Sequence, residues 1–215
     1  MIEWVSRGGP VMIPIILSSV VALAAVLERL WALRRERVVP QAFCVELIDL
    51  IRQERFPDAL TLCRKKDSSI ARILEVALEA RGSSRSDLKE KVEEVGRRES
   101  AELERFVPIL GTVSTLGPLL GLLGTTLGMI KTFEGIESGG MGQMTFVAGG
   151  IGIALITTFS GLLVAIPSVI AHQYLLSRVD RLVVDLEEVS LGVVDLLVAP
   201  AETPRAEAEP ARARS

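Results

Sequence analysis

Two long stretches of this chain contain no Asp, Glu, Lys or Arg: 25 residues between Arg105 and Lys131, and 40 residues between Glu137 and Arg178. A helix rises 1.5 Å per residue and the hydrocarbon core of a bilayer is about 30 Å thick, so about 20 apolar residues span it. The two stretches therefore predict a transmembrane hairpin. Both carry threonines among glycines, and polar groups in membrane helices usually face protein or water.

Charge is concentrated in one part of the chain. Residues 34–105 hold 16 of the 24 basic and 15 of the 27 acidic residues, whereas 49% of the whole chain is hydrophobic. This segregation is typical of an integral membrane protein with a water-facing insert. The net charge of −3, without a basic stripe interleaved with aromatics, argues against nucleic-acid binding. Cys44 and Cys63 follow neither CxxC nor metal-ligand spacing, which predicts free, reduced thiols.

A third apolar segment near the N-terminus, residues 11–33, contains Pro14 and closes with Glu28 and Arg29. Such long side chains, one turn from the end of a membrane helix, can reach back to the interface. A signal peptide is the alternative. Residues 1–9 lack a basic region, however, and no small-x-small cleavage site follows, so we expect a retained helix.

Basic residues near the helix ends predict the orientation, because cytoplasmic flanks are enriched in Lys and Arg. Six arginines flank the insert, whereas the outer flanks hold only two basic residues; they are Arg34, Arg35, Arg37, Arg97, Arg98 and Arg105 against Arg7 and Lys131. The insert and the C-terminus are therefore expected in the cytoplasm. The predicted segments are an outer N-terminus at 1–10, transmembrane helices at 11–33, 106–130 and 144–171, a cytoplasmic helical insert at 34–105, an outer loop at 131–143, a cytoplasmic heptad helix at 172–199 and a disordered tail at 200–215.

The cytoplasmic segments are predicted to be helical extensions. Ser86 is a plausible N-cap for a helix that continues into the second span without interruption. After the third span, apolar residues alternate steps of 4 and 3 over three heptads; they are Leu175, Val179, Leu182, Leu186, Val189, Val193 and Leu196. This seam needs a partner helix, either the chain's own insert or a neighbouring subunit. The tail has no periodicity, which is typical of disorder.

Small residues recur on one face of each charge-free helix, and such faces allow close helix approach. The predicted packing set is Gly117, Pro118, Gly121, Gly124 and Gly128 on the second span, and Gly150, Ala154, Gly161, Ala165 and Pro167 on the third. Thr125 borders the first face, and Thr157 or Thr158 the second. Two interpretations stay open: hydroxyls bonded to their own backbone, or hydroxyls that line an ion pathway.

The cores of the second and third spans contain no titratable side chain, and His172, the only histidine, follows the third span. The chain alone therefore cannot relay protons through titratable groups. It also lacks a constellation for acid–base, nucleophilic or metal chemistry. We expect no enzymatic activity, no cofactor and no metal, and any ion transfer would need a titrating group from a partner.

Two motifs carry a family resemblance. Residues 116–133, LGPLLGLLGTTLGMIKTF, resemble the second-span signature of the MotA/TolQ/ExbB proton-channel family, and residues 150–169, GIGIALITTFSGLLVAIPSV, resemble its third-span signature. Residues 28–33 and 55–63 add weaker support. The number of predicted spans, three rather than four, is similar to that of the ExbB/TolQ branch of the family. The third span differs from the family pattern at one position: close relatives carry Glu where this chain has Ile153.

The resemblance implies an all-α stator in the bacterial inner membrane: a homopentameric ring around two single-span ExbD- or TolR-like subunits, whose membrane Asp carries the proton. It implies that Thr125 and Thr158, with Thr157 beside them, line the pore, and that proton flow drives a TonB- or TolA-like protein. An oligomeric membrane scaffold without ion transport is the alternative. The energised process, the branch, the ion and the effect of Ile153 stay open at this point.

Overall fold

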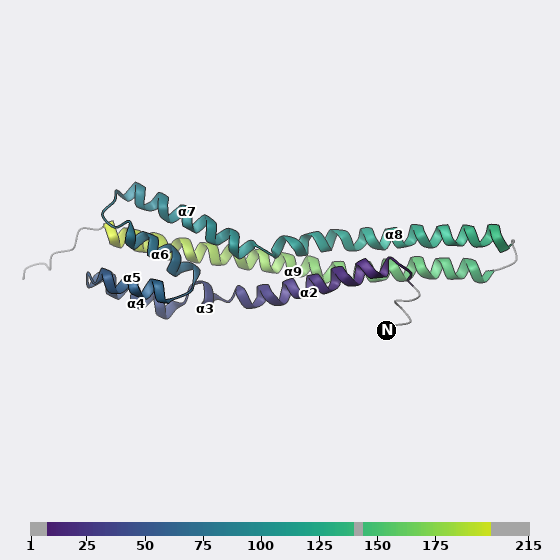
Figure 1. Cartoon of the computed structure of the whole chain (residues 1–215), viewed down its shortest axis with the longest axis horizontal. Coiled ribbons are helices and arrows are strands. Elements are labelled where there is room, and N and C mark those ends of the chain that lie inside the picture. The colour runs from purple at the N-terminus through teal and green to yellow at the C-terminus, as the bar shows by residue number, and fades with distance from the viewer. Residues whose placement is uncertain (1–7, 140–143, 199–215) are drawn as a thin grey trace, which may run out of the picture. The chain divides into compact units, whose positions relative to one another are not determined.

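The computed structural model describes residues 8–139 and 144–198 and is helical throughout its regular structure (Figure 1). Its helices are α2 (Met12–Ala32), α3 (Arg35–Val38), α4 (Gln41–Arg52), α5 (Phe56–Lys65), α6 (Ser69–Glu79), α7 (Arg85–Glu104), α8 (Val107–Gly139) and α9 (Met144–Val198). By length and composition, three helical stretches could cross a membrane. This confirms the predicted all-α fold with three candidate spans. The predicted tail lies outside the described residues.

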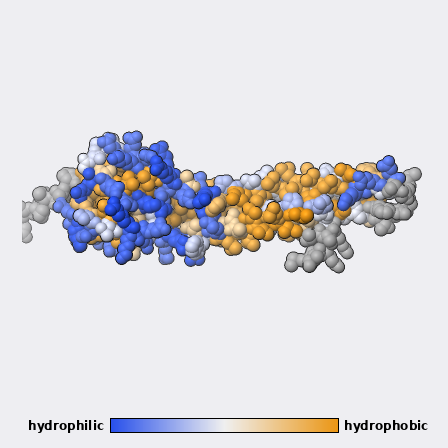
Figure 2. Space-filling model, in the orientation of Figure 1, coloured by the Kyte–Doolittle hydropathy of each residue, from blue (hydrophilic) through white to orange (hydrophobic). Residues whose placement is uncertain are grey.

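The chain divides into two compact units, and the first comprises Met1–Arg37 and Ser100–Val183. Here Val11, Met12 and Ile15 at the start of α2 form a buried cluster, against which four apolar side chains pack; these are Leu120, Leu127, Ile156 and Val164. The outer surface of this unit is largely apolar (Figure 2). An apolar exterior is what lipid as solvent requires.

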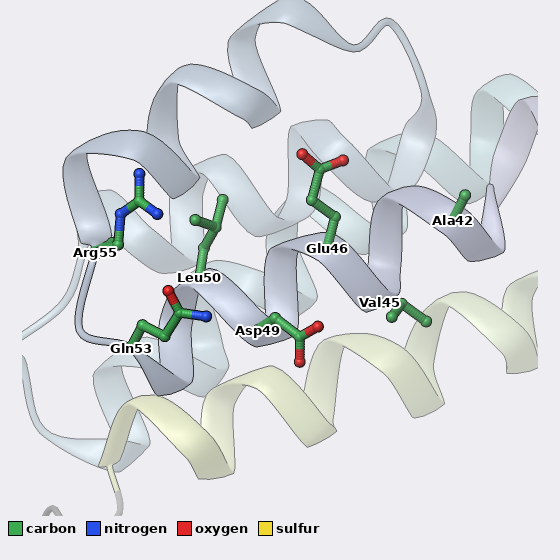
Figure 3. Close-up of a pocket in the computed structure, with 7 residues that line it drawn as sticks. All are labelled: Ala42, Val45, Glu46, Asp49, Leu50, Gln53 and Arg55. Carbon is green, nitrogen blue, oxygen red and sulfur yellow. The ribbon is translucent and has the colours of Figure 1, made fainter.

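The second unit comprises Val38–Glu99 and Val184–Ser215. Its core contains fully buried aliphatic side chains from α4, α5 and α6; these are Leu47, Ala59, Ile70, Leu74 and Ala77. Its exterior is hydrophilic (Figure 2). An open hollow on α4 is lined by Val45, Glu46, Asp49 and neighbouring residues (Figure 3). Across the described residues, no three His, Cys, Asp or Glu side chains come together as a metal site.

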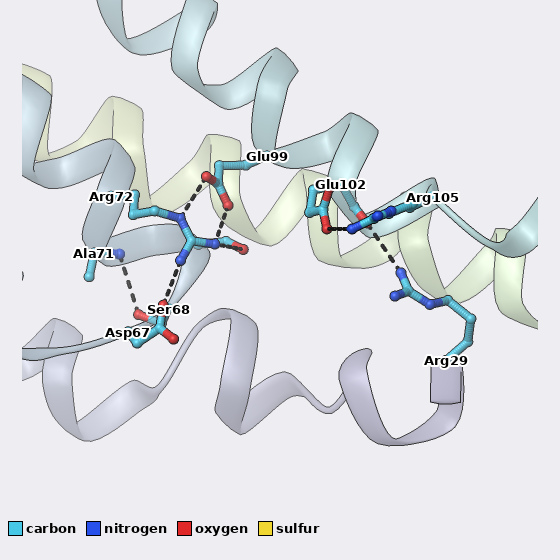
Figure 4. A network of polar contacts seen from close by, with 9 residues as sticks. Arg29, Asp67, Ser68, Ala71, Arg72, Glu99, Glu102 and Arg105 are labelled. Atoms are coloured by element: carbon cyan, nitrogen blue, oxygen red, sulfur yellow. Dashed lines mark hydrogen bonds and ion pairs between the residues drawn. The ribbon is translucent and has the colours of Figure 1, made fainter. Parts of the chain in front are cut away.

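Ion pairs connect the helices of the second unit. Arg72 on α6 binds Glu99 through two hydrogen bonds of 2.7 and 2.6 Å and also pairs with Asp67 at 2.7 Å (Figure 4). Arg64 on α5 pairs with Glu75 and Glu79 on α6. The bidentate arrangement with Glu99 fixes geometry as well as adding energy.

The start of α7 differs from the predicted one. Ser84, not Ser86, accepts a hydrogen bond from the backbone N–H of Asp87 at 3.2 Å, and α7 begins at Arg85. Nor does α7 continue into the membrane helix, because a turn at Arg105 and Phe106 separates it from α8. Pro108 follows in the first turn of α8, where its missing N–H is tolerated.

The heptad seam of α9 is largely buried within the chain itself. In the first unit Leu175, Val179 and Leu182 have at most 4% of their surface exposed, and in the second Leu186 and Val193 have at most 2%. Of the two partners considered for this seam, the chain's own helices therefore cover it.

Candidate ion pathway in the transmembrane hairpin

Helices α8 and α9 approach each other through glycine. A Cβ added to Gly117 would lie 2.7 Å from the carbonyl oxygen of Gly161 and 3.0 Å from the Cβ of Ala165. A Cβ added to Gly121 would lie 3.0 Å from the Cα of Thr158. A side chain at Gly117 would therefore force backbone to shift, and one at Gly121 would be tightly packed.

The same contact continues towards the C-terminal end of α8. A side chain at Gly124 would overlap the hydroxyl of Thr157, and one at Gly128 would lie 2.5 Å from the carbonyl oxygen of Gly150 and 3.2 Å from the Cβ of Ala154. The structure thus brings together the glycines and alanines of the predicted packing set. Pro118 and Pro167 lie inside α8 and α9 with exposed rings, so any packing role for them lies outside this chain.

The three predicted pathway threonines have different surroundings. Thr157 is fully buried, and its hydroxyl donates to the carbonyl oxygens of Ile153 at 2.9 Å and Ala154 at 3.1 Å. Thr158 is half-buried and donates across the helix contact to the carbonyl oxygen of Gly121 at 3.4 Å. Thr125, also half-buried, donates to the carbonyl oxygen of Leu122 at 2.6 Å.

These hydrogen bonds define what the hydroxyls can still do. A hydroxyl has one proton to donate and two lone pairs that accept. Since each donor here already serves a carbonyl, Thr125 and Thr158 keep only acceptor capacity on their exposed sides. Such an oxygen can accept a hydrogen bond from water or from a protonated carboxylic acid, whereas an ionised carboxylate has no proton to donate to it.

Comparison with known proteins identifies the family of this chain. Residues 65–188 match the MotA/TolQ/ExbB proton channel family. The chain belongs to this family. The protein named ExbB-like 1 of Synechocystis is 34% identical over 179 residues, which cover 80% of this chain and 68% of that protein. The Tol-Pal system protein TolQ of Pseudomonas aeruginosa is 40% identical over 86 residues, which cover 40% of this chain and 37% of TolQ. The biopolymer transport protein exbB1 of Vibrio cholerae is 42% identical over 94 residues, which cover 43% of this chain and 39% of that protein.

The family match establishes the general class of this protein. The chain is a multi-pass membrane protein of the ExbB/TolQ proton channel family, as its motifs predicted. Proteins of this channel family are not enzymes, which agrees with the absence of a catalytic constellation from the sequence.

Two arginines, Arg29 and Arg178, cap helix ends in this ExbB/TolQ-family protein, a role that the sequence did not predict for either. Arg29, near the end of α2, is only 5% exposed and donates to the carbonyl oxygens of Glu102 at 3.2 Å and Leu103 at 3.1 Å (Figure 4). Its guanidinium also pairs with Glu28 and lies 4.9 Å from the centre of the Phe106 ring. Arg29 therefore caps the end of α7 instead of reaching back to water as expected.

Arg178 on α9 has the corresponding role at α2. Its Nε donates to the carbonyl oxygen of Leu33, the C-cap residue of α2, at 2.8 Å. A cation at a helix C-terminus satisfies free carbonyls and opposes the negative end of the helix dipole. The only sequence signal for either residue is an arginine close to a predicted helix end, which does not reveal its partner.

Proposed function

We propose that the chain is the ring-forming stator subunit of an ion-driven motor in a bacterial inner membrane. In this proposal five copies surround single-span ExbD- or TolR-like subunits, and proton flow drives a TonB- or TolA-like protein. The insert and the C-terminus face the cytoplasm and the N-terminus faces the outside. Family membership supports the partner class, and the distribution of arginines supports the orientation.

The observation that carries the proposal is the half-buried Thr158, which lies on a hairpin whose membrane cores, 106–130 and 144–171, contain no titratable side chain. A membrane carboxyl group from a partner would supply the missing proton carrier. When protonated, it can donate to the oxygen of Thr158 or Thr125; when ionised, it loses that hydrogen bond. The threonines would thus favour the neutral, mobile form of the carrier within the apolar part of the pathway.

Replacement of the threonines by valine tests this assignment, because valine keeps the shape and removes the oxygen. The chain would be co-purified with its partner, reconstituted in liposomes and assayed for proton flux with a pH-sensitive dye. We expect Thr158→Val and Thr125→Val to assemble normally but to lose most of the flux. Thr112→Val is the matched control, since Thr112 also donates to its own backbone, at Pro108, and is exposed.

The outcome also separates a channel from a scaffold. If Thr125→Val and Thr158→Val both keep full flux, neither hydroxyl lines the pathway. If the unmodified complex conducts no protons under any gradient, the scaffold is the better description. Ile153→Ala should be mild, because Ile153 carries no titratable group.

A further inference from the structure

One face of α2 is exposed and apolar along its whole length. Its members are Ile13, Leu17, Val20, Leu27 and Trp31, each with between 54% and 69% of its surface exposed. Their spacing keeps them on one side of a helix, opposite the buried Met12, Ile15, Ala22 and Ala25. In a membrane protein such a face is suited to acyl chains.

This apolar face ends in a tryptophan and two arginines. The guanidinium carbon of Arg37 lies 3.3 Å from the centre of the Trp31 ring. Arg34 follows Trp31 by three positions and is exposed. Among the residues that the structure describes, no carboxylate pairs with Arg34 or Arg37, whereas Arg29, Arg64, Arg72 and Arg85 all have one.

Helix capping does not occupy these two guanidinium groups. The carbonyl oxygen of Leu33 at the end of α2 accepts from Arg178, so that end already has its cation. Arg34 and Arg37 outnumber Glu36, the one acid within residues 34–37, so a net positive charge remains where the apolar face stops.

We propose that Trp31, Arg34 and Arg37 bind the phosphate headgroup of an anionic phospholipid whose acyl chains lie along the exposed face of α2. Guanidinium groups bind phosphate through paired hydrogen bonds, and stacking on Trp31 holds Arg37 ready to do so. Tryptophan itself favours the boundary between acyl chains and headgroups. A free phosphate ion would use the arginines alone and gain nothing from the apolar face, so a lipid fits the whole surface better.

Fluorescence of Trp31 reports this binding directly. Trp4 is the other tryptophan of the chain, so Trp4→Phe leaves Trp31 as the only indole. The full-length protein would be reconstituted in phosphatidylcholine, with increasing fractions of phosphatidylglycerol brominated near the headgroup, and compared with brominated phosphatidylcholine. We expect the anionic lipid to quench Trp31 at a much lower fraction than the zwitterionic one.

Variants separate specific binding from general attraction. A basic residue near the surface contributes about fivefold to the affinity for anionic lipid, so Arg34→Gln or Arg37→Gln should weaken the preference about fivefold each. The matched control is Arg81→Gln, since Arg81 also stacks on an aromatic ring, that of Phe56 at 3.8 Å, within the insert. It should leave the preference unchanged.

Two results would overturn the proposal. Equal quenching by both lipids would show that the surface does not recognise charge. Loss of the preference on addition of millimolar inorganic phosphate, at constant ionic strength, would assign the arginines to a soluble anion instead. The quenching measurement does not require proton flux, so the lipid-binding proposal can be refuted while the proposed channel function stands.

Discussion

Thr157 and Thr158 are neighbours in the sequence, yet one is fully buried beside Gly124 and the other keeps exposed surface beside Gly121. Successive residues of a helix point about 100° apart, so a one-residue shift changes the environment completely. The motif predicts that hydroxyls are present on this face. It does not predict which of them is buried, because that depends on the rotation of α9 against α8.

At the same scale, the thiols of Cys44 and Cys63 are predicted to resist alkylation in the folded protein. Both are buried. Burial raises the pKa of Cys44, and burial with the nearby Glu75 and Cys44 raises that of Cys63 to about 12. The thiolate fraction of Cys63 at pH 8 is therefore ~10⁻⁴. Mass spectrometry should find both thiols unmodified by maleimide until the protein is denatured.

The raised pKa of Cys63 also predicts how stability depends on pH. The folded state keeps this proton while the unfolded thiol, with an ordinary pKa of 9.0, ionises first. The contribution is complete below about pH 9 and is lost as pH rises towards 12. Between pH 8 and 10 the free energy of unfolding should fall by about 1 kcal/mol more in the parent than in Cys63→Ala. If denaturant titrations show the same loss of unfolding free energy in the parent and in Cys63→Ala, ionisation of Cys63 is not the cause.

At the scale of helices, the tight contact of α8 with α9 predicts an asymmetric response to added methyl groups. Gly124→Ala would drive a Cβ into the Thr157 side chain and should cost about 1–3 kcal/mol of stability. Gly152→Ala on α9 meets nothing within 4 Å and should be neutral or slightly stabilising. Thermal unfolding of the two purified variants in detergent compares their stabilities. Equal midpoints would mean that α8 and α9 can shift apart at Gly124 at little cost in free energy.

The junction of α7 and α8 gives a second prediction about helices. Arg29→Met keeps the aliphatic stem and removes the charged donors to Glu102 and Leu103, which should cost about 2–4 kcal/mol. Arg105→Met is the control, because Arg105 lies beside the same Phe106 but makes an exposed ion pair with Glu102 at 3.1 Å, worth at most about 1 kcal/mol. Limited chymotryptic cleavage after Phe106, a site that both variants keep, should increase only in the first variant.

The spans follow from length and apolar composition, so the sequence was sufficient to predict three candidate membrane helices. The break between α7 and α8 was not predictable in the same way. The carbonyls it frees are satisfied by Arg29, some 73 positions away, and local periodicity carries no information about such a partner. The glycine spacing, in contrast, is local, and it identified the residues at the α8–α9 contact.

At the scale of the whole molecule, the buried native thiols decide how topology can be measured. An added cysteine at Ser83, in the exposed turn before α7, should be protected from an impermeant reagent in intact spheroplasts and labelled after lysis. One at Glu137, exposed near the end of α8, should be labelled without lysis. The reverse pattern would invert the proposed orientation.

Assembly is the other prediction for the whole molecule. The proposed pathway requires neighbouring subunits, because a single hairpin cannot enclose a pore, whereas lipid alone could cover the apolar outer surface of the first unit (Figure 2). Native mass spectrometry from mild detergent, with lipid retained, should show a pentamer, with additional mass when the partner is co-expressed. A spectrum of monomers alone under those conditions would be incompatible with a ring.

The glycine contact between α8 and α9 also constrains how such a chain can diverge. Any change at Gly117, Gly124 or Gly128 places atoms where the opposite helix already has them, so a single substitution there would persist only alongside a second one across the contact. The aliphatic residues on the outer face of α2, unlike Trp31 at its end, meet no such restriction. Among descendants of this sequence, paired changes should therefore accumulate slowly in the hairpin while α2 drifts freely between one aliphatic residue and another.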